Sequence, residues 1–144
     1  MKKNIIFIFA ALMTVIAGGL TACSDNGADA KVNTFVEQLN SDAFKDQAVK
    51  SGVFTNAEAK VEDDAVVLTF STIPALSFKN ATREIMEAQK AGMIAQFKQA
   101  VPADKVFREG FEGMQEKGMS FRMTFLDTNG DSASIDILPA EVLE

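Results

Sequence analysis

Apolar residues recur along most of this chain at two spacings, one typical of helices and the other of strands. Near the start they fall three and four residues apart, at Val32, Phe35, Val36 and Leu39, which predicts one buried face of a helix. A polar run of asparagine, serine and aspartate then interrupts this pattern. A second, shorter helix is predicted from Asp42 to Lys50, because a glycine follows it closely.

Two more helices are predicted in the middle of the chain. The first runs from about Phe78 to Ala100, where a proline stops it. The second has Asp104 as its expected N-cap and Gly118 as its expected C-terminal glycine. Within it, Gly110 and Gly113 would allow close packing on a neighbouring element. The expected buried residues are Ile85, Ala88, Gln89, Met93 and Phe97 on the first helix, and Phe107, Phe111 and Met114 on the second.

Between the two pairs of helices, strict alternation of apolar and polar residues predicts a β-hairpin. A two-residue turn at Asp63 and Asp64 would place all its alternating apolar side chains on one face. The resulting cross-strand pairs are Val61–Val66, Ala59–Leu68 and Ala57–Phe70.

A second hairpin is predicted near the C-terminus, and two registers compete for it. A two-residue Asn-Gly turn would mix apolar and polar residues on both faces. A three-residue loop, Thr128 to Gly130, keeps one face entirely apolar if Gly130 adopts the left-handed backbone conformation. This register also sets Arg122 opposite Asp136. We therefore predict the pairs Phe125–Ala133, Met123–Ile135 and Phe121–Ile137. Pro139 is expected to end the last strand and leave a short acidic tail.

Together these elements predict an α+β domain of two layers. The two hairpins would join into one antiparallel sheet, with the helices packed on its apolar face.

The first 23 residues follow a different pattern. Lys2 and Lys3 precede an uncharged, mostly apolar run, and Leu20-Thr21-Ala22-Cys23 closes it with the one cysteine of the chain. This layout is that of a secretory signal peptide. Its end resembles the lipobox of bacterial lipoprotein precursors. That resemblance implies removal of residues 1–22 and acylation, for example with palmitate, of the Cys23 sulfur. A conventional signal peptide and an uncleaved helical anchor are the alternatives, and a plain transmembrane anchor has no reason to place a cysteine there.

Cleavage before Cys23 would leave a lipidated tether at residues 23–28 and a single domain at 29–144. The resemblance implies a location in the cell envelope, anchored to a membrane; Ser24 is compatible with the outer membrane of a Gram-negative cell. The layout of hairpin, two helices and final hairpin resembles a group of small bacterial lipoproteins, which implies no particular activity.

Composition restricts the chemistry of the domain. Removal of the leader leaves 12 basic against 20 acidic residues, a net charge of −8, so nucleic acid is a poor partner. The chain lacks His, Trp and Tyr, which excludes His-activated nucleophiles and the usual zinc sites. We predict no catalytic residue and no cofactor. The leading hypothesis is a non-catalytic binding module for an envelope protein or ligand. The alternative is a carrier or sensor of a small apolar ligand, held between helices and sheet.

Two acidic groups are the remaining candidates for chemistry. Asp127, Asn129 and Asp131 have the alternate spacing of a calcium loop but lack its later glycine and glutamate, and a hairpin turn explains these residues without a metal. We therefore predict no metal site, although the sequence leaves binding of a cation by these three residues open. The cluster Glu58, Glu62, Asp63 and Asp64 is interpreted as a charged surface that protects a sheet edge. Five methionines are expected in the core or in an adaptable pocket: Met86, Met93, Met114, Met119 and Met123.

Overall fold

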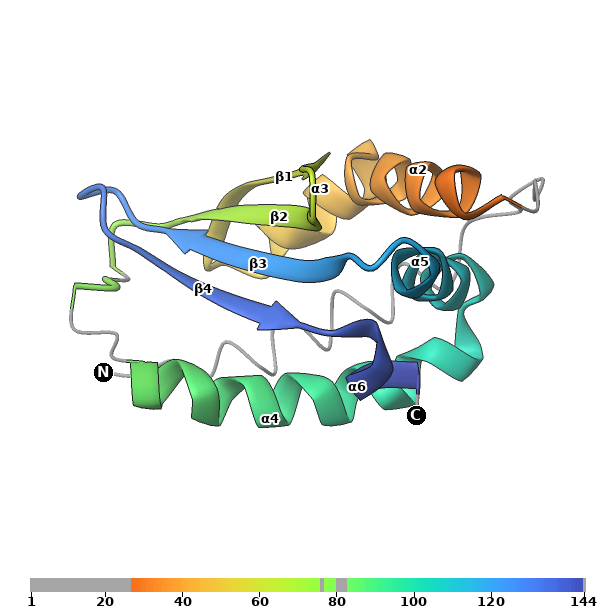
Figure 1. The fold of residues 1–144 in the computed structure, drawn as a ribbon. Helices are drawn as coiled ribbons and strands as arrows, with labels where there is room; N and C mark the ends of the chain where they lie inside the picture. Colours follow the sequence, from red (N-terminus) through yellow and green to blue (C-terminus); the bar gives the residue numbers. More distant parts are fainter. Residues whose placement is uncertain (1–26, 76, 80–82, 144) are drawn as a thin grey trace.

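The computed structural model describes residues 27–75, 77–79 and 83–143, and it confirms the α+β class (Figure 1). In chain order the elements are α2 (Ala28–Leu39), α3 (Asp42–Lys50), β1 (Phe54–Val61), β2 (Ala65–Thr72), α4 (Arg83–Ala100), the 3-10 turn η1 (Val101–Ala103), α5 (Lys105–Glu116), β3 (Ser120–Leu126), β4 (Ser132–Ile137) and α6 (Pro139–Leu143).

One sheet of four strands, in the order β1-β2-β3-β4, contains both predicted hairpins. Each hairpin has the predicted register: Ala59 pairs with Leu68 in the first, and Met123 pairs with Ile135 in the second. Gly130 has a φ of 90° at the tip of the second hairpin, as the three-residue loop requires. The requirement that the apolar side chains share one face therefore selected the correct register in both hairpins.

The junction between the hairpins differs from the prediction. We expected an antiparallel sheet throughout, but β2 and β3 are parallel, with Ala65 beside Ser120 and Ser71 beside Leu126. The cause lies in the connection, because α4 and α5 together return the chain to the end of the sheet where β2 began. Parallel neighbours need a crossover of this kind, whereas antiparallel neighbours can be joined by a short turn.

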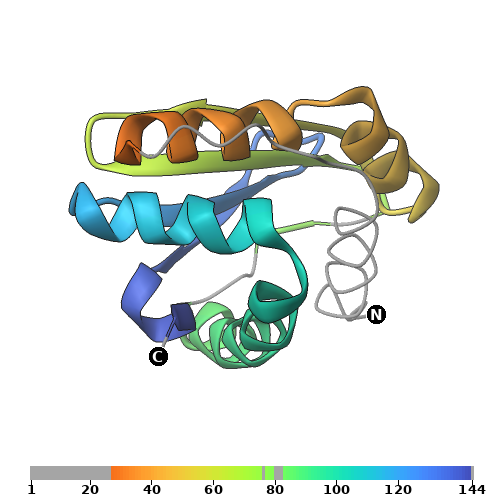
Figure 2. The same cartoon turned by 90° about the vertical axis from the view of Figure 1, so that its right-hand side faces the viewer.

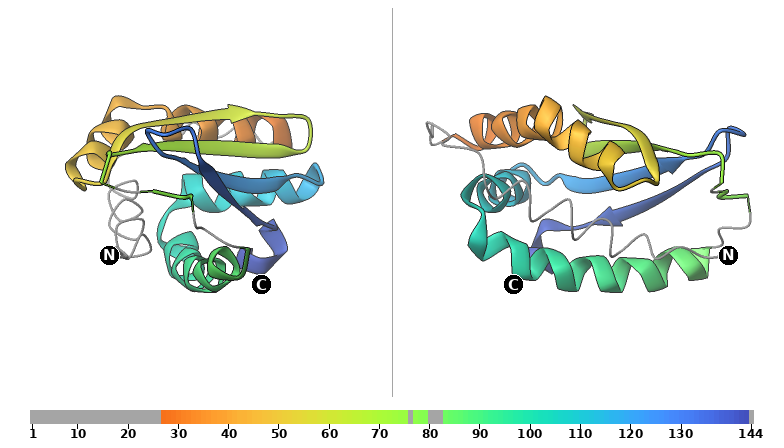
Figure 3. Two further views of the ribbon diagram at one scale, coloured as in Figure 1. Left: turned by 90° about the vertical axis from the view of Figure 1, so that its left-hand side faces the viewer. Right: turned by 180° about the vertical axis from the view of Figure 1, so that it is seen from behind.

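The pairing divides the sheet into an apolar and a polar face. Its three apolar rows are Ala57-Phe70-Phe125-Ala133, Ala59-Leu68-Met123-Ile135 and Val61-Val66-Phe121-Ile137. Helices α2, α4 and α5 meet the apolar face at Phe121, whose ring lies 5.5–6.1 Å from those of Phe35, Phe97 and Phe111. Figure 2 shows α2 and α5 side by side along the sheet, and the right panel of Figure 3 shows α3 close to β1.

Phenylalanine rings fill the space between the helices and the sheet. Phe35, Phe97, Phe107, Phe111 and Phe121 are each at most 1% exposed, and they contact one another in a single cluster. A second group stacks over the other end of the sheet: the rings of Phe54 and Phe70 lie 4.4 Å apart, and Phe125 stacks between Phe70 and Phe78.

Two expectations about the helices are wrong. Phe78 and Lys79 lie outside α4, because the Phe78 N–H donates to the Asp127 carboxylate and its ring packs on the sheet. Ala88, predicted to be buried, is exposed, since α4 turns the side of Met93 and Phe97 inward. The last strand ends before Pro139, as predicted, and the acidic tail after it forms α6, which has proline as its first residue. The Glu141 carboxylate accepts the N–H of Leu138 and so caps this helix.

Candidate cleft between α4 and the edge strand β4

The predicted acidic loop at the tip of the second hairpin is a hydrogen-bonded turn. Asp127 is buried, and its Oδ1 accepts the N–H groups of Asn129 and Asp131 at 2.9 and 3.0 Å. Its Oδ2 accepts the N–H of Phe78 at 2.8 Å. These bonds, that from Phe78 foremost, lower the pKa of the Asp127 carboxyl. Backbone donors thus occupy both oxygens of Asp127. Among the described residues, no group of three or more acidic or cysteine side chains could hold a metal ion.

The other sequence candidates lie on the surface or in the core. Glu58, Glu62, Asp63 and Asp64 are all exposed, and Glu62 forms an ion pair with Lys60 at 3.4 Å. Of the methionines, four are buried in the core, namely Met93, Met114, Met119 and Met123. Met86 is only partly buried, and it lines a cleft that the sequence did not predict.

The two edges of the sheet are treated differently. At the β1 edge, the Asn40 side chain acts as a substitute strand: its Nδ2 donates to the Ala59 carbonyl at 2.8 Å, and its Oδ1 accepts the Ala59 N–H at 2.7 Å. Asn40 directly follows α2, so the helix that covers the sheet also closes this edge. An edge closed in this way cannot accept another strand at that position.

The β4 edge remains open over most of its length. The Asp127 N–H donates to the Asp131 carbonyl, and this bond shows which residues of β4 pair with β3. In an antiparallel pair the hydrogen-bonded residues alternate, so the backbone groups of odd-numbered residues bond β3 and those of even-numbered residues point away from the sheet. In the described part of the chain, the outward backbone groups of Ser132, Ser134 and Asp136 have no hydrogen-bond partner. Leu138 is the next outward residue, and Glu141 bonds both its N–H and its carbonyl.

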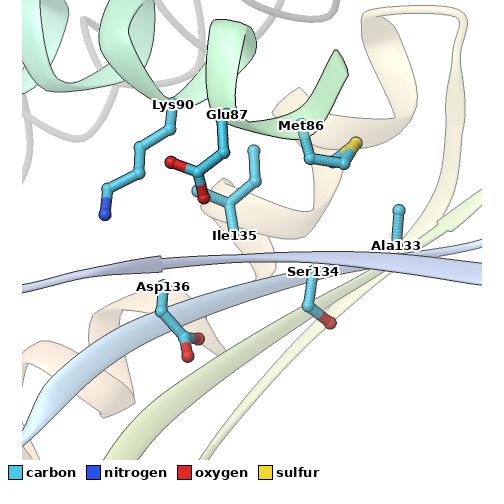
Figure 4. A pocket seen from close by; sticks show the side chains of 7 residues that line it. All are labelled: Met86, Glu87, Lys90, Ala133, Ser134, Ile135 and Asp136. Carbon is cyan, nitrogen blue, oxygen red and sulfur yellow. The ribbon is translucent and has the colours of Figure 1, made fainter. Parts of the chain in front are cut away.

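A cleft of about 440 Å³ runs along this open edge, between β4 and α4 (Figure 4). Its α4 wall consists of Met86, Glu87 and Lys90, and its β4 wall is the segment from Ala133 to Asp136. Ala133 and Ile135 point toward α4, whereas Ser134 and Asp136 point to the opposite face of the sheet.

The charge of the cleft is predominantly negative. Lys90 lies 3.5 Å from Glu141, which already neutralises it. Glu87 is exposed and has no ion-pair partner among the described side chains, which do not include that of Arg83. Asp136 adds a second carboxylate at the outer rim, which is half exposed and forms an ion pair with Arg122. The cleft therefore suits a cationic rather than an anionic partner.

The polar face of the sheet beside the cleft is held by two cross-strand contacts. Arg122 donates to both oxygens of Asp136, at 2.7 and 3.3 Å, and the hydroxyls of Thr124 and Ser134 lie 2.9 Å apart. The hydrogen bond to Asp136, together with the negative charge of Asp136, raises the pKa of Arg122 above its ordinary value. The predicted pairing of Arg122 with Asp136 on the open side is confirmed.

Cys23, the predicted lipidation site, lies outside the described residues. None of the helices in the described part of the chain has the length and apolar character needed to span a bilayer. No protein family, curated protein or solved structure matches the chain.

Sequence reasoning missed the cleft because its walls are far apart in the chain. Residues 86–90 and 133–136 come together only through the crossover and the position of β4 at the edge. One signal was present: the alternation of Ser132, Ser134 and Asp136 with apolar residues marks a strand with one solvated face. That pattern identifies the exposed face but not the open edge.

Proposed function

We propose that this protein is a lipoprotein of the cell envelope, anchored to a membrane through Cys23, and that its domain binds a partner without catalysing a reaction. The supporting sequence feature is the run Leu20 to Cys23 at the end of an apolar leader. Two or three acyl chains on one residue would provide a stable anchor, since a single chain gives only marginal binding.

The open β4 edge is the observation that carries the binding role. Proteins normally cover, charge or shorten an exposed strand edge, because it invites pairing with another chain. Here Asn40 closes the opposite edge, while the outward backbone groups of Ser132, Ser134 and Asp136 have no partner in the described part of the chain and lie beside a cleft. Such an edge is the element that peptide-binding domains use to add a strand.

A second candidate function is the carriage of a small apolar ligand. Phenylalanine rings fill the space between α2, α5 and the sheet, which argues against a ligand there. The cleft between α4 and β4 also lies between a helix and the sheet, and Met86, Ala133 and Ile135 give it an apolar floor. Native mass spectra of the purified full chain would then contain a non-covalent ligand in addition to the acyl mass.

Labelling of cells with radioactive palmitate tests the anchor. We expect label and membrane association for the natural chain, and loss of both for Cys23→Ala. Chemical cross-linking in the same cells tests the binding role, and we expect a single stoichiometric partner that is lost with the anchor. An unlabelled natural chain contradicts the anchor, whereas a labelled chain that is recovered alone and ligand-free contradicts the binding module.

A further inference from the structure

We propose that the partner presents an extended segment rich in lysine or arginine, and that this segment adds to the sheet as a fifth strand along β4, beside α4. This inference rests on the proposed binding function and specifies its site and the chemistry of its partner.

The hydrogen-bonding groups of β4 define the form of the ligand. Ser132, Ser134 and Asp136 each direct an N–H and a carbonyl outward, spaced as in any antiparallel ladder. A helix cannot satisfy such a row, whereas an extended backbone can. The segment would end before Leu138, because Glu141 already bonds that residue.

The walls of the cleft define the side chains. On an added strand, alternate residues would point toward α4, where they would meet Met86, Ala133 and Ile135. The residues between them would lie beside Ser134 and Asp136 on the open face. Small or apolar side chains fit the first set, and polar or basic side chains fit the second.

The charged groups of the cleft determine which charge the partner segment should carry. Glu87 on α4 and Asp136 on β4 place carboxylates on both walls. Lys90 is paired with Glu141 and Asp136 is paired with Arg122, so Glu87 leaves the described groups around the cleft with one net negative charge. The whole chain is also acidic, with a net charge of −6 before processing. A second copy of this chain would bring its own Asp136 and Glu87 into the same cleft, so like charges disfavour a β4–β4 dimer.

The test uses the full chain in nonionic detergent micelles and a fluorescent peptide of alternating lysine and valine as the probe. We expect the peptide to bind, and a peptide of alternating glutamate and valine not to bind. Added salt should weaken the binding, because both walls carry negative charge.

Ser134 offers a matched pair of variants. Ser134→Pro removes an outward N–H without removing a bond to β3, since proline is tolerated where the N–H of an edge strand faces solvent. Ser134→Ala loses the same hydroxyl contact to Thr124 but keeps the N–H. We expect Ser134→Pro to weaken binding about tenfold or more, and Ser134→Ala to leave it within about twofold. Glu87→Gln should weaken it by about two- to fivefold.

Amide hydrogen exchange gives a readout that needs no variant. In the free protein the N–H groups of Ser134 and Asp136 should exchange quickly, and the lysine–valine peptide should slow both. Equal binding by Ser134→Pro and Ser134→Ala, equal binding of the two peptides, or protection on another face overturns the proposal. A dimer in sedimentation without peptide binding assigns the edge to a second copy instead. If the peptide fails while cells still yield a Cys23-dependent partner, only this inference falls.

Discussion

At the scale of single residues, Gly110 sets the distance between α5 and α2. A Cβ at this position would lie 2.5–2.8 Å from three carbon atoms of the Phe35 side chain. Phe35 is fully buried and contacts three other rings, so it has no room to move. The glycine that weakens the helix locally is therefore what permits the tight packing of the core.

Gly110→Ala tests this packing. Alanine improves helix propensity by about 1 kcal/mol, but forcing a methyl group into a filled core costs about 1–3 kcal/mol. The clash is severe here, and we expect a net loss of about 1–2 kcal/mol in the free energy of unfolding, measured by urea denaturation. Gly27→Ala is the control for the added methyl group, because its Cβ would meet nothing within 4 Å. Gly27 is the N-cap of α2, where alanine is less favourable than glycine, so we expect a smaller loss of about 0.5 kcal/mol there. A Gly110→Ala protein as stable as the natural one would refute the close approach.

Asp127 predicts how stability depends on pH. Backbone N–H groups favour its charged form and hold its pKa below the ordinary value of 3.8. A lowered folded pKa stabilises the fold above the unfolded value, and this contribution disappears as the pH falls through the folded pKa.

We therefore expect Asp127→Asn to be less stable than the natural chain near neutral pH, with a difference that narrows below about pH 4. Urea denaturation at a series of pH values measures both curves. A constant difference down to about pH 2 would show that the Asp127 charge does not contribute.

At the scale of elements, Asn40 connects the end of α2 to the β1 edge. Asn40→Ala removes both bonds to Ala59, and we expect a loss of about 1–2 kcal/mol in the free energy of unfolding. Asn56→Ala, at an exposed position of the same strand, should change stability much less. The variant should also aggregate more readily, because its β1 edge is open. Equal effects of the two substitutions would contradict the closing role of Asn40.

The elements also show which parts of the fold the sequence encodes locally. The register of each hairpin was predictable, because a slip of one residue would turn residues such as Met123 and Ile135 to solvent. The parallel pairing of β2 with β3 was not, since it depends on where a two-helix crossover returns the chain. The start of α4 was also missed, because Phe78 is held by Asp127, 49 residues away.

At the scale of the whole molecule, the anchor and the cleft follow from different kinds of information. The leader and Cys23 are read from consecutive residues, so the sequence alone predicts them. The cleft joins α4 to the last strand, and its open edge exists only because β4 is outermost. The candidate site is thus a property of topology, and no local pattern predicted it.

The most direct test of the account is site-specific photo-cross-linking in intact cells, with the reactive group at Ser132 on the β4 edge or at Lys60 on the distant β1 strand. Both positions are exposed, so they differ mainly in their distance from the cleft. We predict that Ser132, but not Lys60, captures one partner through an extended segment rich in lysine or arginine, and that Cys23→Ala abolishes the capture. Capture from Lys60 alone, or through a folded or acidic surface, would contradict the account.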